Sequence, residues 1–107
     1  MDKEKLADKM FEDTIDECVK LRQERKKIYH NSWFTQENSC DSNFYGGIIN
    51  KTNRLKILHL NRLQTNSIEK YEDCLKDLII LTLFTLVCHK DELHQLKNQK
   101  RIRDYDK

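Results

Sequence analysis

A run of eleven residues without a charge, LIILTLFTLVC at 78–88, constrains the fold of this chain more than any other feature. It has about half of the ~20 apolar residues that cross a bilayer, so it predicts a buried helix of a soluble protein. Because apolar side chains occupy every side of such a helix, other elements must surround it. The run therefore predicts a central core helix.

The rest of the chain also favours helices. Its 107 residues include no proline, two glycines and 36% charged residues, a composition typical of exposed helix faces. Apolar residues recur with a period of about 3.6 over 3–28 and, less regularly, over 45–63. A third helix is expected from about 67 through the apolar run, with Asn66 or Ser67 as its N-cap. We therefore expect a single all-α domain over 1–107, a small bundle of three to four helices.

Residues 30–44, HNSWFTQENSCDSNF, predict an irregular segment between the first two helices. Asn, Ser and Asp side chains hydrogen-bond to the nearby backbone and compete with helix formation. The segment also carries Trp33, Phe34 and Phe44, so we expect a loop that folds back onto the helices. Two interpretations stay open: a loop that contacts a ligand, or a lid that completes the core.

Three or four helices barely enclose a fully apolar one, so we expect a second copy of the chain to complete the bundle. A homo-oligomer is the predicted assembly. The charged segment 95–107 is expected to form an exposed tail that frays towards its end.

Several functional classes are not favoured by the composition. A net charge of +2 gives little drive towards nucleic acid, although 20–27 and 97–103 are locally basic. The start, MDKEKLADK, lacks the apolar region of a signal peptide, so we expect a cytoplasmic protein without membrane association. The four cysteines form no C-x-x-C pair and the four histidines lack ligand spacing, so reduced thiols are expected and a zinc site is not.

Two carboxylates stand at the entrance to the apolar run. On a helix, Asp73 and Asp77 fall on one stripe with Ile80, Phe84 and Cys88, so both acids share a face with core residues. Carboxylates in that position require a cation, either Mg²⁺ or a basic side chain from another helix. The alternative is that they only complement the helix dipole.

Acidic and basic residues of the other helices supply possible partners. In EDTIDE at 12–17, Asp13 and Asp16 could join the later acids around a metal, or serve only solubility. Arg22 falls within the apolar face of the first helix and needs an anion, from an acidic side chain or from a ligand phosphate. Lys51 and Arg54, three residues apart, share a helix face and could meet the same anion.

Three short motifs occur in order: Y-x-x-S-W at 29–33, K-x-x-R-L at 51–55 and D-C-L-K-D-L at 73–78. With them the chain resembles the nucleotide modification associated domain 1 family, small proteins common in phages. It departs from the family pattern at His30, where the family has Gly, and at Cys74, where it has Thr. The residues that carry the resemblance are Arg25, Tyr29, Ser32, Trp33, Lys51, Arg54, Leu55, Glu69, Asp73 and Asp77.

The resemblance implies an all-α protein that binds or acts on nucleotides. In the first hypothesis it binds a linear or cyclic nucleotide without a cofactor, and in a phage setting it sequesters a nucleotide signal of the host in the host cytoplasm, as an anti-defence protein. Trp33 or Tyr29 would stack on the base, basic side chains would meet phosphates, and the acids would orient them. The expected ligand-binding residues are Arg22, Arg25, Tyr29, Trp33, Lys51, Arg54, Asp73 and Asp77.

The second hypothesis is an Mg²⁺-dependent nucleoside-triphosphate pyrophosphohydrolase of MazG type, in which acidic residues bind the metal. Its metal ligands would be Asp13, Asp16, Asp73 and Asp77. The MazG-type motifs are incomplete here, since E-D-T-I-D at 12–16 carries shorter acids and the later half reads D-x-x-x-D. The third hypothesis is a structural homo-oligomer or weak nucleic-acid binder, with the aromatic residues as core.

Overall fold

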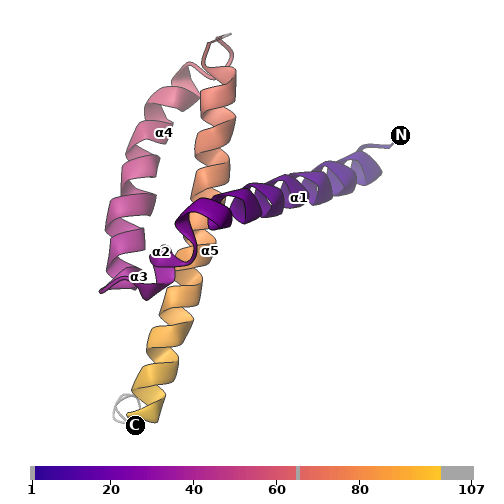
Figure 1. The fold of residues 1–107 in the computed structure, drawn as a ribbon. Coiled ribbons are helices and arrows are strands. Elements are labelled where there is room, and N and C mark those ends of the chain that lie inside the picture. Colours follow the sequence, from indigo (N-terminus) through magenta and orange to yellow (C-terminus); the bar gives the residue numbers. More distant parts are fainter. Residues whose placement is uncertain (1, 65, 100–107) are drawn as a thin grey trace, which may run out of the picture. The chain divides into compact units, whose positions relative to one another are not determined.

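The computed structural model describes residues 2–64 and 66–99, and these ranges contain helices and no strand. The expected all-α class is confirmed. The chain divides into two compact units, Met1–Ser32 and Trp33–Lys107, which are described separately. The elements are α1 (Lys3–Tyr29), α2 (Ser32–Thr35), α3 (Ser39–Asp41), the π-helix η1 (Ser42–Ile49), α4 (Asn50–Leu60) and α5 (Ile68–Asn98) (Figure 1).

The first unit consists mainly of α1, which matches the helix predicted over 3–28. Asp2 is the N-cap, and its carboxylate accepts a hydrogen bond of 2.9 Å from the Lys5 amide. Lys26 and Lys27 in the last turn complement the negative end of the helix dipole. The helix ends at His30, whose φ of 53° and ψ of −136° break the helical path.

The second unit contains more helix than the sequence predicts. Residues 30–44 were expected to be irregular, and this is wrong for the three helices that cover 32–35, 39–41 and 42–49. Asp41, Ser42, Ile49 and Asn50 all have right-handed helical dihedral angles, so 39–60 is one continuous helical rod with a π segment inside it. The second predicted helix therefore begins before 45, and it ends at Leu60 rather than near 63.

The rod packs antiparallel against α5, and the chain reverses between Leu60 and Ile68 (Figure 1). Ser67 occupies the expected N-cap position of α5, although its side chain makes no capping hydrogen bond within the described residues. Glu69 lies in the first turn, where its charge complements the helix dipole. The expected tail over 95–107 continues α5 to Asn98, and its part from 100 onwards lies outside the described residues.

The core of the second unit lies between η1, α4 and one face of α5. Cys74, Ile80 and Cys88 are buried on that face, as is Asn43 of η1. The opposite face of α5 exposes the large apolar side chains of Ile79, Leu83, Leu86 and Val87, so the described part of a single chain encloses the apolar run on one face only. Among the described helices, none combines the length and the apolar character needed for a membrane crossing.

Candidate functional site

An ion pair links the start of α4 to the first third of α5. Lys51 Nζ lies 3.1 Å from Asp77 Oδ2, and the side chains are 33% and 14% exposed respectively. Asp77 stands on the predicted stripe of α5, on which Ile80 and Cys88 are buried. A carboxylate this close to an apolar core is stabilised by a cation, and Lys51 supplies it. A basic side chain is one of the two kinds of cation that the sequence predicts for this carboxylate.

The backbone around Lys51 is held by α5 as well. The buried Cys74 thiol lies 3.6 Å from the Lys51 carbonyl oxygen, to which it donates a weak hydrogen bond. Lys51 is the second residue after the π-helix, which ends at Ile49. Both contacts fix the register of α4 on α5.

Trp33 of α2 packs on the stripe of α5 that contains Asp77, at Phe84, two helical turns further along α5. Its indole stacks on the Phe84 ring, with centroids 4.0 Å apart and planes inclined by 3°, and meets Phe34 edge-on. The stack confirms that the aromatic segment folds back onto a helix. Aromatic stacking fixes the plane of the indole, which remains partly exposed.

Asn43, which no sequence motif indicates, holds the Trp33 segment in place. Its buried amide group donates to the carbonyl oxygens of Trp33 at 2.8 Å and Ser39 at 2.7 Å, and lies 3.6 Å from Cys88 Sγ. A buried amide that uses its donors in this way joins α2, α3 and α5. No local signal distinguishes Asn43 from the other Asn and Ser residues around it.

Cys40 and Glu92 lie close to this cluster. Partial burial raises the pKa of the Cys40 thiol above its ordinary value of 9.0, and a hydrogen bond with Glu92 and the charge of that carboxylate raise it further. Because the thiolate is the reactive form, Cys40 is a weak nucleophile at neutral pH. The four cysteines are free in the structure, and three of them, Cys18, Cys74 and Cys88, are buried.

The other predicted residues of the second unit lie at the surface. Asp73, one turn before Asp77, is exposed, and so is Arg54, one turn after Lys51. Their exposure places them on the rim of the Lys51–Asp77 pair rather than in the core. The expectation that both acids of α5 turn towards the core therefore applies to Asp77 alone.

The remaining predicted residues belong to the first unit. The guanidinium group of Arg22 donates to Asn31 Oδ1 at 2.9 Å, so an amide oxygen of the same unit is one of its partners. Arg25 is partly buried, Tyr29 is exposed, and Asp13 and Asp16 are exposed on α1. Within the described ranges, no group of three or more His, Cys, Asp or Glu side chains is arranged to hold a metal ion.

Comparison of this chain with family models, with curated proteins and with solved structures found no match. The functional argument therefore depends on the residues themselves.

Proposed function

We propose that this protein binds a phosphorylated nucleotide beside the Lys51–Asp77 pair. The observation that carries the proposal is the placement of Lys51, whose ammonium group is held 3.1 Å from Asp77 while a third of the side chain stays exposed. An ammonium group has three donors, so it can bind a phosphate oxygen while it keeps its carboxylate partner. Since the side chain is already ordered, binding costs less conformational entropy.

The neighbouring Trp33 supports a nucleotide rather than an inorganic anion. It stacks on Phe84, seven residues after Asp77, and seven residues of helix span roughly 10 Å. A ligand with an aromatic base at one end and phosphates at the other fits two such points. A base that stacks on the indole meets a surface whose orientation Phe84 already fixes. Arg54, one turn from Lys51, is placed to meet a second phosphate oxygen.

Binding is favoured over hydrolysis because Asp77 already has a cationic partner. As a magnesium ligand, Asp77 would have to exchange the Lys51 ammonium group for the metal, at the cost of a partly buried ion pair. We therefore propose sequestration of a linear or cyclic nucleotide signal, with anti-defence as its role in a phage setting. Arg22, Arg25 and Tyr29 belong to the other unit and stay predictions from the sequence, and a MazG-type pyrophosphohydrolase is the alternative that release of pyrophosphate would detect.

The backbone at His30 supports the resemblance on which the nucleotide proposal partly depends. The nucleotide modification associated domain 1 family has glycine at this position, and His30 has a positive φ of 53°. Glycine is the residue that adopts positive φ without steric cost. The positive φ at position 30 is therefore a conformation that the glycine of the family would adopt more easily than His30.

A thermal-shift screen of linear and cyclic nucleotides, with Mg²⁺ and with a chelator, tests the proposal. A ligand that binds only the folded state raises the free energy of unfolding, by about 3 kcal/mol at a hundredfold excess over its Kd, and so raises the melting temperature. We expect a shift that the chelator does not remove, and recovery of the intact nucleotide after denaturation. Release of pyrophosphate in the presence of Mg²⁺ would instead establish the hydrolase, and no shift with any nucleotide would overturn both.

Two matched variants on α4 locate the site. Arg54→Ala removes an exposed cation next to Lys51, so we expect the ligand-induced shift to fall while the melting temperature without ligand stays the same. Lys56→Ala makes the same charge change at another exposed position of α4 and serves as the control. Equal loss of the shift in both variants would mean that ligand binding follows net charge and not this site.

A further inference from the structure

A stripe of exposed apolar residues runs along α1. Phe11 is 68% exposed, Ile15 46% and Val19 47%, although all three are large apolar residues. Their spacing of four residues places them on one face of the helix, here called the α1 stripe. An isolated helix in water is marginal without packing of its apolar face. The α1 stripe therefore has the properties of a docking surface.

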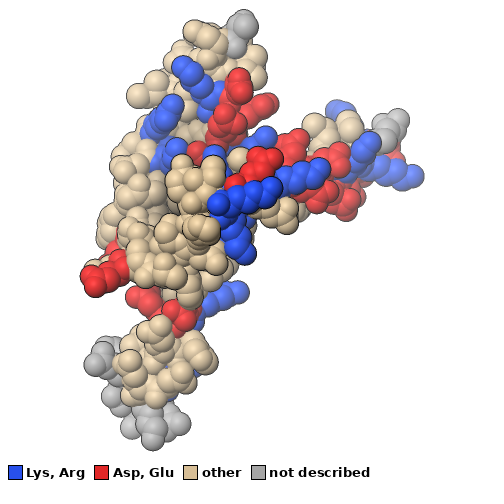
Figure 2. All heavy atoms as spheres, viewed as in Figure 1, with Lys and Arg blue, Asp and Glu red and all other residues tan. Residues whose placement is uncertain are grey.

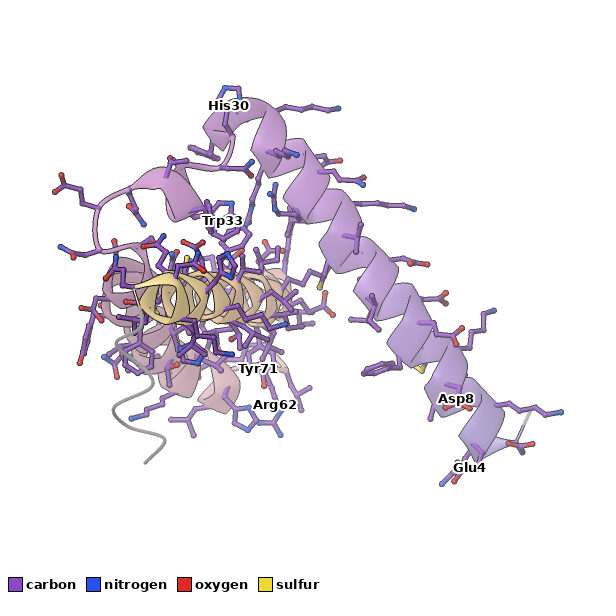
Figure 3. All side chains as sticks on the ribbon, turned by 90° about the horizontal axis from the view of Figure 1, so that it is seen from below. Glu4, Asp8, His30, Trp33, Arg62 and Tyr71 are labelled. Carbon is purple, nitrogen blue, oxygen red and sulfur yellow. The ribbon has the colours of Figure 1, made fainter. Side chains whose placement is uncertain are left out.

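The charges of α1 are segregated along its length. Residues 2–17 contain seven acidic and three basic side chains, whereas 18–29 contain five basic and one acidic. Figure 2 shows the crowding of charged groups along this helix, and Figure 3 shows Glu4 and Asp8 in its N-terminal half. The helix dipole accounts only for the charges in the first and last turns. The segregation continues well beyond them.

Like charges also repeat at the spacing that repels. Glu4, Asp8, Glu12 and Asp16 follow one another every four residues, and Arg22 and Lys26 do the same in the second half. Like-charged pairs at this spacing destabilise an isolated helix by about 0.2–0.5 kcal/mol each. Opposite charges on a partner would reverse that effect.

We propose that the α1 stripe pairs antiparallel with the α1 stripe of a second copy of this chain. In this arrangement Ile15 faces Val19 of the other copy, and Asp8 faces its Lys26. In an antiparallel pair of identical helices, the numbers of two facing residues add up to the same total along the whole interface. Both pairs have that total, so one register allows both, and the two-fold symmetry of the dimer repeats each contact. A parallel pair would place acidic half against acidic half.

A second copy suits this surface better than another class of partner. A uniformly basic partner would neutralise only the first half of α1, and a nucleic acid only the second half. A partner with a basic half, an apolar centre and an acidic half in reversed order matches the whole stripe, and the antiparallel copy has that order. The pairing does not depend on nucleotide binding.

Cross-linking of the full-length protein tests the orientation directly. A carbodiimide joins a carboxylate to an amine that touches it, and Asp8 and Lys26 of one straight α1 are about 27 Å apart. In a mixture of unlabelled and ¹⁵N-labelled protein, we expect Asp8–Lys26 cross-linked peptides with one light and one heavy partner. Absence of this mixed peptide overturns the antiparallel pairing.

Charge-reversal variants test the energetics, with the dimer dissociation constant measured by analytical ultracentrifugation. Asp8→Lys and Lys26→Asp are each expected to weaken the dimer by about tenfold, and the combined variant is expected to restore it. Asp13→Lys makes the same charge change on the opposite side of α1 from Ile15 and is expected to leave the dimer intact. A monomeric wild-type protein, or equal dissociation constants for Asp8→Lys and wild type, overturns the proposal.

Discussion

At the scale of single residues, Asn43 and His30 define the path of the chain around Trp33. Asn43 is 6% exposed and its amide group bonds to two backbone carbonyls. His30 has a backbone conformation, φ 53° and ψ −136°, that residues with a Cβ rarely adopt. The first residue stabilises the segment and the second stores strain in it.

Asn43→Ala is expected to lower the free energy of unfolding by about 1–3 kcal/mol, because it removes both hydrogen bonds of a buried amide and leaves a void. Asn50→Ala is the control, since the Asn50 amide makes one exposed hydrogen bond to the Gly46 carbonyl. Urea denaturation measures both. Similar small losses in the two variants would mean that the Trp33 segment does not depend on Asn43.

His30→Gly is expected to raise the free energy of unfolding by about 1 kcal/mol, because glycine adopts this conformation without strain. Asn38 also has a positive φ, of 52°, but Asn tolerates the left-handed helical region that Asn38 occupies. Asn38→Gly should therefore raise the free energy of unfolding by less than His30→Gly does. Chemical denaturation of both variants measures the two changes in the free energy of unfolding. A lower free energy of unfolding in His30→Gly would show that the imidazole stabilises the protein by more than the strained backbone destabilises it.

At the scale of secondary-structure elements, the approach of η1 to α5 sets the register of the second unit. A Cβ added at Gly47 would lie 2.8 Å from Leu81 Cδ2, so the rod and α5 are in direct contact there. Lys51 lies one turn after Gly47 on the rod, and Asp77 lies one turn before Leu81 on the antiparallel α5. The ion pair of the candidate site therefore depends on a glycine that lets two helices approach closely.

The two adjacent glycines give a matched pair of variants. Gly46→Ala is expected to stabilise the protein by about 0.5–1 kcal/mol, because alanine has the higher helix propensity and the added Cβ meets no described heavy atom within 4 Å. Gly47→Ala has the same propensity gain but displaces Leu81, so we expect it to be about 1–3 kcal/mol less stable than Gly46→Ala. Thermal and urea unfolding measure the difference. Equal stability of the two variants would contradict a close helix contact at Gly47.

At the scale of the whole molecule, burial is uneven along the chain. Residues 2–17 are all exposed, whereas Cys74, Ile80 and Cys88 are buried along α5. Local opening requires least free energy where few apolar contacts are lost. The two units should therefore differ in how easily their amides exchange with solvent.

Hydrogen exchange measured by mass spectrometry tests this expectation. In dilute solution, we expect amides of 3–17 to exchange much faster than those around Ile80 in α5, whose opening approaches global unfolding. Protection of 3–17 should rise with protein concentration if α1 pairs with a second copy. Equal protection of both regions at the lowest concentration would contradict the uneven burial.

The predictions from sequence succeeded where the signal is local. The bounds of α1 follow from its periodicity, and the break before α5 follows from the polar segment that precedes it. The prediction failed within 30–44, because the Asn, Ser and Asp residues there were expected to compete with helix formation. Asn43 donates to the nearby Ser39 carbonyl and also to Trp33 and Cys88, which are distant in the chain, and these distant contacts override its preference for local turns.

For the candidate site too, local features could be predicted from the sequence and contacts between helices could not. The stripe of α5 that contains Asp77, and the shared face of Lys51 and Arg54, follow from helical spacing alone. That Lys51 is the partner of Asp77, and that Trp33 stacks on Phe84, could not be predicted, since the register of two helices depends on which surfaces fit together.

The sequence by itself determined the helical class of this protein, the bounds of α1 and the start of α5, because caps, breakers and periodicity act between residues that are close in the chain. Only the tertiary structure decided that the segment after Trp33 is helical and that Lys51 meets Asp77. Those features depend on close packing at Gly47 and on a buried amide at Asn43, which are contacts between residues far apart in the chain.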